Sequence, residues 1–362
     1  MKAAVLREVG KPLEIEDVTI DKPGPREVLI RTSATGVCHS DLHFVDGLWP
    51  IQMPVILGHE SAGVVEAVGD LVRHCAVGDH VITCLSAFCG HCDHCLSGHP
   101  ARCGGIETDR APQDPPRLSQ GGSGIGQFAH LSSFAEQMLV HENAVVKIRE
   151  DMPMDKAALI GCGVMTGVGA VFRTAAVEPG STVAVIGCGG VGLSAVNGAD
   201  MAGASRVIAV DVVASKLELA KTFGATDVVN AAETDPVEAV KELTGGGVHY
   251  SFEAIGLKAT AEQSWAMLGT GGTATIIGMI PFGTKIELPG HQFLSERKIQ
   301  GSTMGSNRFR IDMPRFVDFY LAGKLRLDDL LSAHVGLGDV NEALQNLKTG
   351  EVARQVILFD AA

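Results

Sequence analysis

The sequence is short of positive charge and of aromatic side chains. Lysine and arginine number 29 against 42 aspartate and glutamate residues, which gives a formal net charge of -13 at pH 7. This balance argues against a broad electrostatic footprint for nucleic acid or for an anionic membrane. Aromatic residues make up only 5% of the chain, while glycine is abundant at 44 residues. That combination favours an α/β architecture, in which many tight turns join strands to helices.

The chain also lacks an obvious export signal or membrane anchor. The first residues, "MKAAVLREVG", contain no apolar core of signal-peptide length and indicate an opening strand. Residues 181–199 run without a charge, but a glycine cluster follows a β-branched run there, as in a buried strand, turn and helix. We therefore expect a cytoplasmic protein, and a length of 362 residues predicts two domains.

Cysteine is scarce, at nine residues, yet four cysteines lie close together in "CGHCDHCLSGHPARC". An odd total is unsuited to a disulfide scaffold, and bridges between residues three apart are strained and close almost no loop. Four thiolates on a tight turn instead predict a closed tetrahedral zinc shell, which is a structural site. The alternatives are an iron–sulfur cluster and four unrelated thiols. The predicted ligands are Cys89, Cys92, Cys95 and Cys103, and the nearby His91, His94 and His99 are expected to face solvent.

From about residue 182, apolar runs alternate with helical patterns, which predicts a doubly wound parallel sheet. The expected strands are "TVAVIG", "RVIAVD", "DVVN", "VHYSFEAIG", "TATIIGM" and "KIQGST". Gly187, Gly189 and Gly192 follow the first strand, where they permit a tight turn and a close approach of pyrophosphate to a helix N-terminus. Asp211 ends the second strand, 19 residues after Gly192. A carboxylate there accepts from ribose hydroxyls and repels a 2′-phosphate, which favours NAD over NADP.

The first 160 residues or so have a different pattern, with short β-type runs broken by proline and glycine. This predicts a compact, mostly antiparallel, barrel-like lobe. Residues 104–127 form a polar, glycine- and proline-rich loop, of a length typical of functional or oligomer-forming loops. Cys38, the pair His59–Glu60 and Cys162 remain. Two cysteines and one histidine leave a fourth zinc position open for a substrate.

These motifs, in this order, resemble those of the zinc-dependent medium-chain alcohol dehydrogenases along essentially the whole chain. The resemblance rests on "GHESAGVVEAVGDLV", the four-cysteine spacing, the glycine fingerprint and the step to Asp211. It implies a GroES-like, β-rich catalytic domain over residues 1–163, completed by residues 304–362. It also implies a Rossmann domain with a doubly wound parallel sheet over residues 164–303. Two zinc ions per chain and NAD would be the cofactors.

The resemblance further implies roles for single residues. Cys38, His59 and Cys162 would hold the catalytic zinc, with Glu60 behind the metal and Asp41 orienting His59. Ser40 and His43 would carry the alcohol proton away, although without the resemblance both are ordinary hydrogen-bonding loop residues. The cofactor would contact His39, Thr166, Gly187, Gly189, Val191, Gly192, Asp211, Lys216 and Arg354. The substrate pocket would be walled by Trp49, Leu85, Phe128 and Met279, for which the alternative is core packing.

An apolar pocket favours primary aliphatic, allylic or benzylic alcohols, which the enzyme would oxidise reversibly to aldehydes. A glutathione-dependent formaldehyde dehydrogenase is the alternative, although such relatives carry an acidic residue where Trp49 stands. Polyol dehydrogenases typically replace the ligand at Cys162 with glutamate. A rival from another class is a non-catalytic, zinc-free relative of the same fold, which would lack the three catalytic zinc ligands.

Two departures within the family bear on cofactor binding and assembly. Many relatives carry arginine where this chain has His39, so we expect weaker cofactor binding and faster release. The long loop after Cys103 resembles that of dimeric relatives, so we expect a homodimer rather than a tetramer. The sequence does not identify the physiological alcohol, and it assigns Cys75, Cys84 and Cys188 no role beyond packing.

Overall fold

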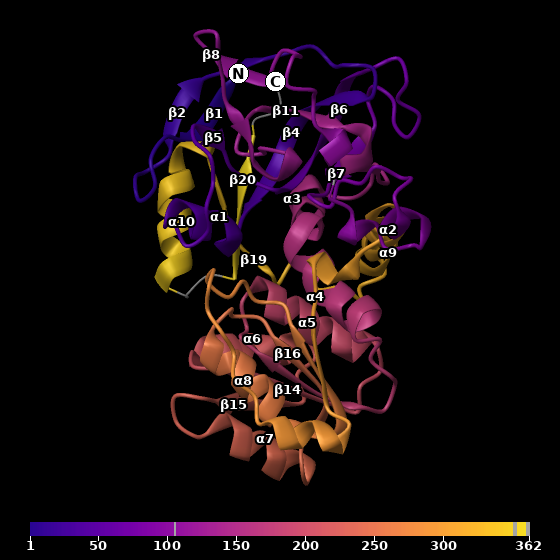
Figure 1. Ribbon diagram of the computed structural model, residues 1–362, viewed down its shortest axis with the longest axis vertical. Coiled ribbons are helices and arrows are strands. Elements are labelled where there is room, and N and C mark those ends of the chain that lie inside the picture. The colour runs from indigo at the N-terminus through magenta and orange to yellow at the C-terminus, as the bar shows by residue number, and fades with distance from the viewer. Residues whose placement is uncertain (105, 350–352, 360–362) are drawn as a thin grey trace. The chain divides into compact units, whose positions relative to one another are not determined.

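The computed structural model describes residues 1–104, 106–349 and 353–359 (Figure 1). The chain forms two compact units, one of residues 1–162 and 308–362 and the other of residues 163–307. The sequence-based domain limits were 163/164 and 303/304. Residues 105, 350–352 and 360–362 of the predicted catalytic domain lie outside the described residues.

The second unit contains a six-stranded parallel sheet in the order β15-β14-β13-β16-β17-β18. The strands are β13 (Thr182–Ile186), β14 (Arg206–Asp211), β15 (Asp227–Asn230), β16 (Val248–Glu253), β17 (Leu268–Ile276) and β18 (Lys298–Gly301). Each corresponds to one of the six predicted apolar runs. Residues 183–186 of the first strand are all buried, as expected for a sheet covered on both faces. The strand order reverses between β13 and β16, which is where such sheets bind dinucleotides.

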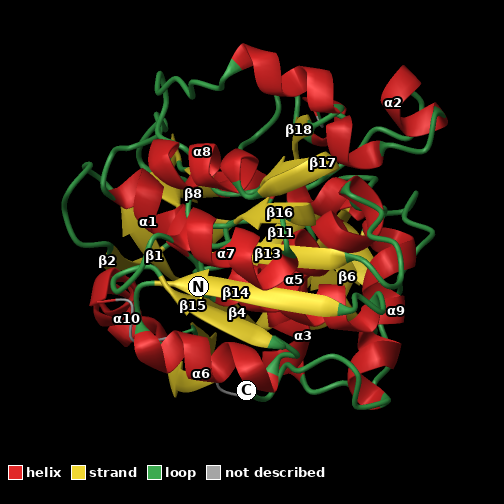
Figure 2. Cartoon of the chain, turned by 90° about the horizontal axis from the view of Figure 1, so that it is seen from below, coloured by secondary structure: helices red, strands yellow, loops and turns green. Residues whose placement is uncertain are grey.

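Four helices cover this sheet. They are α5 (Gly190–Met201), α6 (Ala214–Thr222), α7 (Pro236–Thr244) and α8 (Lys258–Ala266). Because parallel crossovers are right-handed, the reversal of strand order puts α5 and α6 on one face and α7 and α8 on the other. The last two helices contact each other, and Figure 2 shows helices on both sides of the strands. The predicted α/β fold class is confirmed.

The first unit is built mostly from antiparallel strands. Its larger sheet has the order β12-β7-β6-β4-β20-β19, with β11 also paired to β4, and a smaller sheet has the order β10-β5-β1-β2. The larger sheet contains β4 (Glu27–Val37), β6 (Glu60–Val68), β7 (His80–Thr83), β11 (Gln137–His141), β12 (Val145–Lys147), β19 (Leu331–Val335) and β20 (Arg354–Leu358). The smaller contains β1 (Lys2–Leu6), β2 (Glu14–Asp17), β5 (Val55–Ile56) and β10 (Gly126–Gln127). Only the pairs β5–β10 and β19–β20 are parallel among the described strands of this unit.

Short helices carry the chemistry-bearing residues of this unit. They are α1 (His39–Val45), α2 (Asp93–Leu96) and α3 (Met154–Leu159), which continues into the π-helical turn η5 (Ile160–Val164). The C-terminal part adds α9 (Phe309–Leu321), α10 (Val340–Thr349) and strand β20. Because β20 pairs with β4, it brings a late segment of the chain to the centre of the sheet.

Among the described residues, one helical stretch is long and apolar enough to cross a membrane by length and composition. It covers residues 154–174, and 83% of its apolar window is buried inside the protein. A core helix passes the same test, so this finding is weak evidence for a membrane span. The charge-free residues 181–199 form strand β13 and helix α5, as predicted.

Residues 106–127 are more ordered than their composition indicated. They contain β8 (Leu118–Gln120) and β9 (Ser123–Gly124), which form a small sheet with β3 (Thr19–Ile20), and also β10. Arg110 and Arg117 both bind the carboxylate of Glu27, at 2.6 and 2.7 Å, and the backbone N–H of Gly24 donates to it at 2.7 Å. Two arginines therefore tie this segment to the first residue of β4.

We expect Glu27→Gln to remove an acid-sensitive part of the stability of the protein. Burial alone would raise the pKa of Glu27, but Arg110, Gly24 and Arg117 together lower it from 4.5 to about 2. A carboxylate with a depressed pKa stabilises the fold above pH 4.5, and this contribution is lost as the pH falls towards 2. By pH 3 the wild type should lose about 2 kcal/mol through this group, and the variant should not. Denaturant unfolding between pH 7 and pH 3 measures the difference.

The exposed Glu8 provides a matched control. Glu8→Gln should leave the pH dependence of the free energy of unfolding as in the wild type. A parallel pH dependence in the wild type and Glu27→Gln would contradict the prediction.

Candidate metal and cofactor sites

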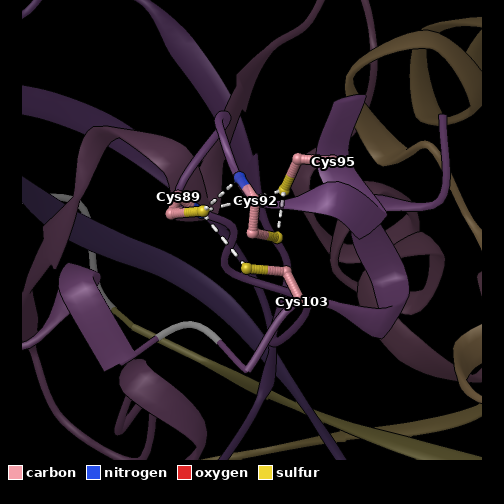
Figure 3. Close-up of side chains that lie close together, drawn as sticks. All are labelled: Cys89, Cys92, Cys95 and Cys103. Carbon is pink, nitrogen blue, oxygen red and sulfur yellow. Dashed lines mark hydrogen bonds between the residues drawn. The ribbon is translucent and has the colours of Figure 1, made fainter. Parts of the chain in front are cut away.

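Four sulfur atoms converge on one point in the lobe that follows β7 (Figure 3). Cys92 is the N-cap of α2, Cys95 lies within that helix, and Cys103 follows the turn η1 (Pro100–Arg102). All four sulfurs, including that of Cys89, lie within 4.8 Å of one another. The Cys89–Cys95 and Cys92–Cys95 sulfur distances are 3.9 and 3.5 Å. Sulfurs around tetrahedral zinc are about 3.8 Å apart, so the cluster has the dimensions of a zinc cage.

The electrostatics of this cluster also suit a cation. Backbone N–H groups of His91 and Cys92 lower the pKa of Cys89 to about 6, whereas burial raises the pKa of Cys95 to about 12. One sulfur therefore carries negative charge readily and another does not until a metal replaces its proton. All nine cysteines of the chain are described, and none is in a disulfide.

A second group of metal ligands lies in the core of the first unit. Cys38, His59, Glu60 and Cys162 are all buried, and their ligand atoms lie within 4.8 Å of one another. Cys38 is the N-cap of α1, His59 directly precedes β6, and Cys162 lies in η5. Three segments far apart in the sequence thus bring together the three predicted catalytic zinc ligands.

The two cysteines and the histidine have the donor chemistry of a metal site. A hydrogen bond with Cys162 lowers the pKa of Cys38 well below its ordinary range and raises that of Cys162, so the pair carries one negative charge. Nε2 of His59 is buried and makes no hydrogen bond within the described part of the chain. An orphaned ring nitrogen beside a thiolate pair fits a borderline cation such as zinc.

Asp41, which the resemblance assigns to orienting His59, is in hydrogen-bonding contact with that residue. Its Oδ1 lies 3.1 Å from His59 Nδ1 and accepts from the backbone N–H of Gly58 at 3.0 Å. Its Oδ2 accepts from the N–H of Cys38 at 3.3 Å. Burial lowers the pKa of His59, but the charges and hydrogen bonds of Asp41 and Cys38 together outweigh it and raise that pKa well above its ordinary value. A fully buried carboxylate therefore fixes the ring and directs Nε2 towards the cysteines.

Glu60 has a carboxylate oxygen within 4.8 Å of the ligand atoms of Cys38, His59 and Cys162. It pairs with Arg354, which was predicted from the resemblance to contact the cofactor. Arg354 Nη2 is 3.5 Å from Glu60 Oε1, and both side chains are almost fully buried. Burial raises the pKa of Glu60 to about 7, with Arg354 opposing the rise. Gly36 on β4 is opposite Glu60, and a Cβ there would lie 2.2 Å from Glu60 Oε2. The need for glycine at position 36 was not recognised from the sequence, because it depends on strand register.

The two proposed proton carriers lie on α1 beside this centre. Ser40 Oγ is 3.7 Å from Cys38 Sγ. Nδ1 of His43 is buried without a hydrogen-bonding partner among the described residues, and burial lowers the pKa of His43. His43 is therefore neutral near pH 7 and has a lone pair available for a proton.

One predicted pocket residue contacts the centre directly. The ring of Phe128 meets that of His59 edge-on, with centroids 5.7 Å apart, and Phe44 supports it at 4.8 Å. Trp49 and Leu85 are half-buried in the same unit, and Leu85 packs against its core. Met279 belongs to the second unit, where its backbone approaches Gly256.

The glycine turn of the second unit has the geometry that its spacing predicted. Gly187 adopts φ +93°, a conformation that favours glycine. Gly189 is the N-cap of α5, and a Cβ on it would meet nothing within 4 Å. A Cβ on Gly192 would lie 1.6 Å from the carbonyl oxygen of Gly187. The third glycine is thus required by the turn itself, and the second leaves open space before a helix N-terminus.

Asp211 links this turn to the end of β14. Its Oδ2 accepts from the N–H of Cys188 at 2.7 Å, and its Oδ1 accepts from those of Val212 and Val213 at 2.8 and 3.0 Å. Of the remaining predicted cofactor residues in this unit, Lys216 is half-buried on α6. Val191 is half-buried on α5, and Thr166 is buried on α4 (Met165–Gly169). His39 is exposed at the start of α1 in the first unit.

Comparison with known proteins identifies two matching family models. The model described as "Alcohol dehydrogenase GroES-like domain" matches residues 24–150, and the model described as "Zinc-binding dehydrogenase" matches residues 190–321. The chain is 40% identical to alcohol dehydrogenase class-3 of Zea mays, over 98% of this chain and 96% of that protein.

Two solved structures are similar over nearly the whole chain. An alcohol dehydrogenase zinc-binding domain protein from Burkholderia ambifaria superposes with a TM-score of 0.95 at 38% identity. The benzyl alcohol dehydrogenase from Acinetobacter calcoaceticus superposes with a TM-score of 0.94 at 35% identity. Each comparison covers 99% of both chains.

Proposed function

The chain belongs to the zinc-dependent medium-chain alcohol dehydrogenase family, and from this premise we propose that it is a NAD-dependent oxidoreductase acting on primary apolar alcohols. The observation that carries the proposal is the buried group of Cys38, His59 and Cys162, with Glu60 beside it. Family membership and the oxidoreductase class follow from the comparisons. The choice of NAD, the substrate and the residue roles are our proposal.

Cys38, His59 and Cys162 would hold a zinc ion that polarises the alcohol oxygen, while NAD would accept the hydride. Three ligands leave one coordination position for substrate. Asp41 keeps a proton on Nδ1 of His59, so Nε2 is the nitrogen that would give up its own proton to bind the metal. Glu60, paired with Arg354, would stand behind the ion, as the resemblance implies, and would leave the fourth position to the substrate.

Ser40 and His43 would move the alcohol proton away from the buried centre. Ser40 is beside Cys38, and its hydroxyl both accepts and donates. His43 follows on the same helix, with a lowered pKa and a buried Nδ1 that has no hydrogen-bonding partner in the described part of the chain. A neutral imidazole is able to take up the proton near pH 7.

Asp211 supports the choice of NAD. It is a carboxylate at the end of β14, next to the glycine turn, and its oxygens are already oriented by three backbone N–H groups. A 2′-phosphate would have to approach this fixed negative charge, whereas the ribose hydroxyls of NAD would donate to it.

Phe128 and the solved relative support an apolar alcohol. An aromatic wall in edge contact with His59 offers an apolar surface beside the metal ligands. The Acinetobacter calcoaceticus relative, by its name, acts on benzyl alcohol. The alternative is a glutathione-dependent formaldehyde dehydrogenase, whose substrate would be the glutathione adduct of formaldehyde.

Initial rates of NADH formation test the proposal. The panel contains benzyl, cinnamyl and hexyl alcohol, ethanol, sorbitol and hydroxymethylglutathione, with NADP in place of NAD as a control. The expected result is rapid turnover of the bulky apolar alcohols with NAD alone. Activity only on hydroxymethylglutathione would favour the alternative. If the protein had no activity on any of these alcohols and no zinc in the buried site, it would instead be a non-catalytic, zinc-free member of the same fold.

Cys89, Cys92, Cys95 and Cys103 would hold a second, structural zinc ion, and reduced thiols in both clusters are consistent with a cytoplasmic location.

We expect Cys103→Ser to lower the zinc content by one ion per chain and to lower the melting temperature. The buried centre should keep its own ion. Elemental analysis and calorimetry check this prediction, and an unchanged metal content would contradict it. The homodimer remains a prediction.

We expect His39→Arg to tighten NADH binding about threefold to tenfold, because a permanent positive charge pairs with a diphosphate better than a mostly neutral imidazole. NADH release should slow by a similar factor, and kcat should fall if release limits turnover. Stopped-flow displacement of NADH measures both constants. His39→Gln should not tighten binding, and an unchanged affinity in His39→Arg would rule out the expected role of this position.

A further inference from the structure

A third group of metal ligands shares one sulfur with the four-cysteine cage. Cys89 Sγ, a ring nitrogen of His91 and a carboxylate oxygen of Glu107 lie within 4.8 Å of one another. His91 is in the turn between Cys89 and Cys92, and Glu107 is in η2 (Ile106–Thr108). The sulfur of Cys89 therefore belongs to two groups of ligands, the four-cysteine cage (Figure 3) and the group that it forms with His91 and Glu107.

This group has the donors and the freedom to bind a zinc ion. Nε2 of His91 lies 2.7 Å from Glu107 Oε2, and both side chains are 64% exposed. Nitrogen and oxygen ligands of tetrahedral zinc are about 3.3 Å apart, so the pair has to open by about 0.6 Å to admit the ion. Exposed side chains make this adjustment at little cost, because a surface ion pair contributes only about 0–1 kcal/mol.

The position of the pair distinguishes it from other surface histidines. His94 and His99 belong to the same lobe and are also exposed, yet neither is in a metal-ligand group among the described residues. Of the three histidines of this lobe, only His91 lies in a described metal-ligand group, together with the carboxylate of Glu107 and the sulfur of Cys89. A closed four-thiolate shell has no vacant position, so a set of outer ligands that shares one of its sulfurs would offer an entering or leaving ion a partly coordinated intermediate position.

We propose that Cys89, His91 and Glu107 form a landing site through which Zn²⁺ enters and leaves the four-cysteine cage. The ion first binds all three residues. It then keeps its bond to Cys89, releases His91 and Glu107, and gains Cys92, Cys95 and Cys103, whose thiol protons pass to water. No electron is transferred, and the exit reverses these steps. The inference rests on the proposed structural zinc ion.

A landing site predicts a specific kinetic signature. It lowers the free-energy barrier both to zinc uptake and to zinc release. It does not change the free energies of the zinc-free and zinc-filled cage. Its loss therefore slows uptake and release by the same factor and preserves the affinity of the cage. Ligands that merely stabilise the filled cage behave differently, since their loss speeds release and weakens the affinity.

The experiment follows zinc exchange in the full-length holoprotein. Release is started with excess EDTA and sampled by metal analysis, and uptake is followed after adding Zn²⁺ to protein stripped of metal under reducing conditions. The release phase that persists in Cys162→Ala belongs to the cage. The variants are His91→Ala and Glu107→Gln, with His94→Ala as the matched control.

We expect both rate constants to fall about tenfold in the two variants, which corresponds to a barrier higher by about 1.4 kcal/mol. Both should remain unchanged in His94→Ala, and the affinity of the cage for zinc should be the same in all four proteins. Equal rates in wild type and variants would overturn the landing site and leave the structural zinc in place. Faster release with a weaker affinity would also overturn it, in favour of a stabilising role. If the wild-type protein held no zinc in the four-cysteine cage, both the landing site and the structural zinc site would be overturned. The proposed dehydrogenase activity of the buried centre would not be affected.

Discussion

Replacing Cys162 with alanine is expected to lower kcat/KM by about 10³-fold or more and to reduce the zinc content from two ions per chain to one. Cys162 is buried beside Cys38 and His59, and the remaining two ligands would hold the ion too weakly to keep it in the open site. The loss of rate has the size of a metal ion that stabilises developing charge by several kcal/mol. Steady-state kinetics and elemental analysis on the same preparation measure both effects.

Cys84→Ala is the matched control, since Cys84 is equally buried but belongs to none of the three metal-ligand groups of the described residues. Its pKa is raised to about 12 by burial, which indicates an inert thiol. This variant should keep two zinc ions and its activity. If Cys162→Ala kept wild-type activity, the buried group would not be the catalytic centre.

Replacing Gly192 with alanine is expected to abolish tight NADH binding and to destabilise the second unit by about 3 kcal/mol. The added Cβ would lie 1.6 Å from the carbonyl oxygen of Gly187, so the turn and the start of α5 have to move apart. The atom that the new Cβ would overlap belongs to the backbone of Gly187, so no flexible side chain can move aside to make room for it. Thermal unfolding and NADH fluorescence titration measure the two effects.

Gly189→Ala separates folding from binding at the same turn. A Cβ on Gly189 meets no protein atom within 4 Å, and its φ of −78° suits alanine, so the melting temperature should not change. The methyl group would nevertheless stand where a pyrophosphate approaches the helix N-terminus. NADH affinity should fall at least about tenfold, which corresponds to roughly 1.4 kcal/mol. Unchanged affinity would show that the cofactor does not bind at this turn.

Features set by neighbouring residues were predictable from the sequence. The six strands of the parallel sheet were identified from strand-type runs between turn residues. The signal is strongest in β13, which is almost wholly apolar because the sheet is covered on both faces there. The glycine spacing and the four-cysteine spacing were equally readable. In each case the chemistry requires residues only a few positions apart, so the local chain conformation suffices.

Features set by distant residues needed the tertiary structure. The contact of Arg354 with Glu60 depends on the pairing of β20 with β4 and of β4 with β6. The order of residues 106–127 depends on Glu27, which captures Arg110 and Arg117. Neither contact has a local signal, because each joins segments that are brought together only by the register of antiparallel strands.

The sequence by itself therefore determined the family, the parallel sheet with its glycine turn and the candidate ligands of two zinc ions. The tertiary structure decided how these residues meet. It placed Cys38, His59 and Cys162 around one point, put Phe128 against the histidine ring and set His91 and Glu107 beside Cys89. The physical reason is that motifs record short-range chemical requirements, whereas the shape of a site is fixed by long-range packing and strand register.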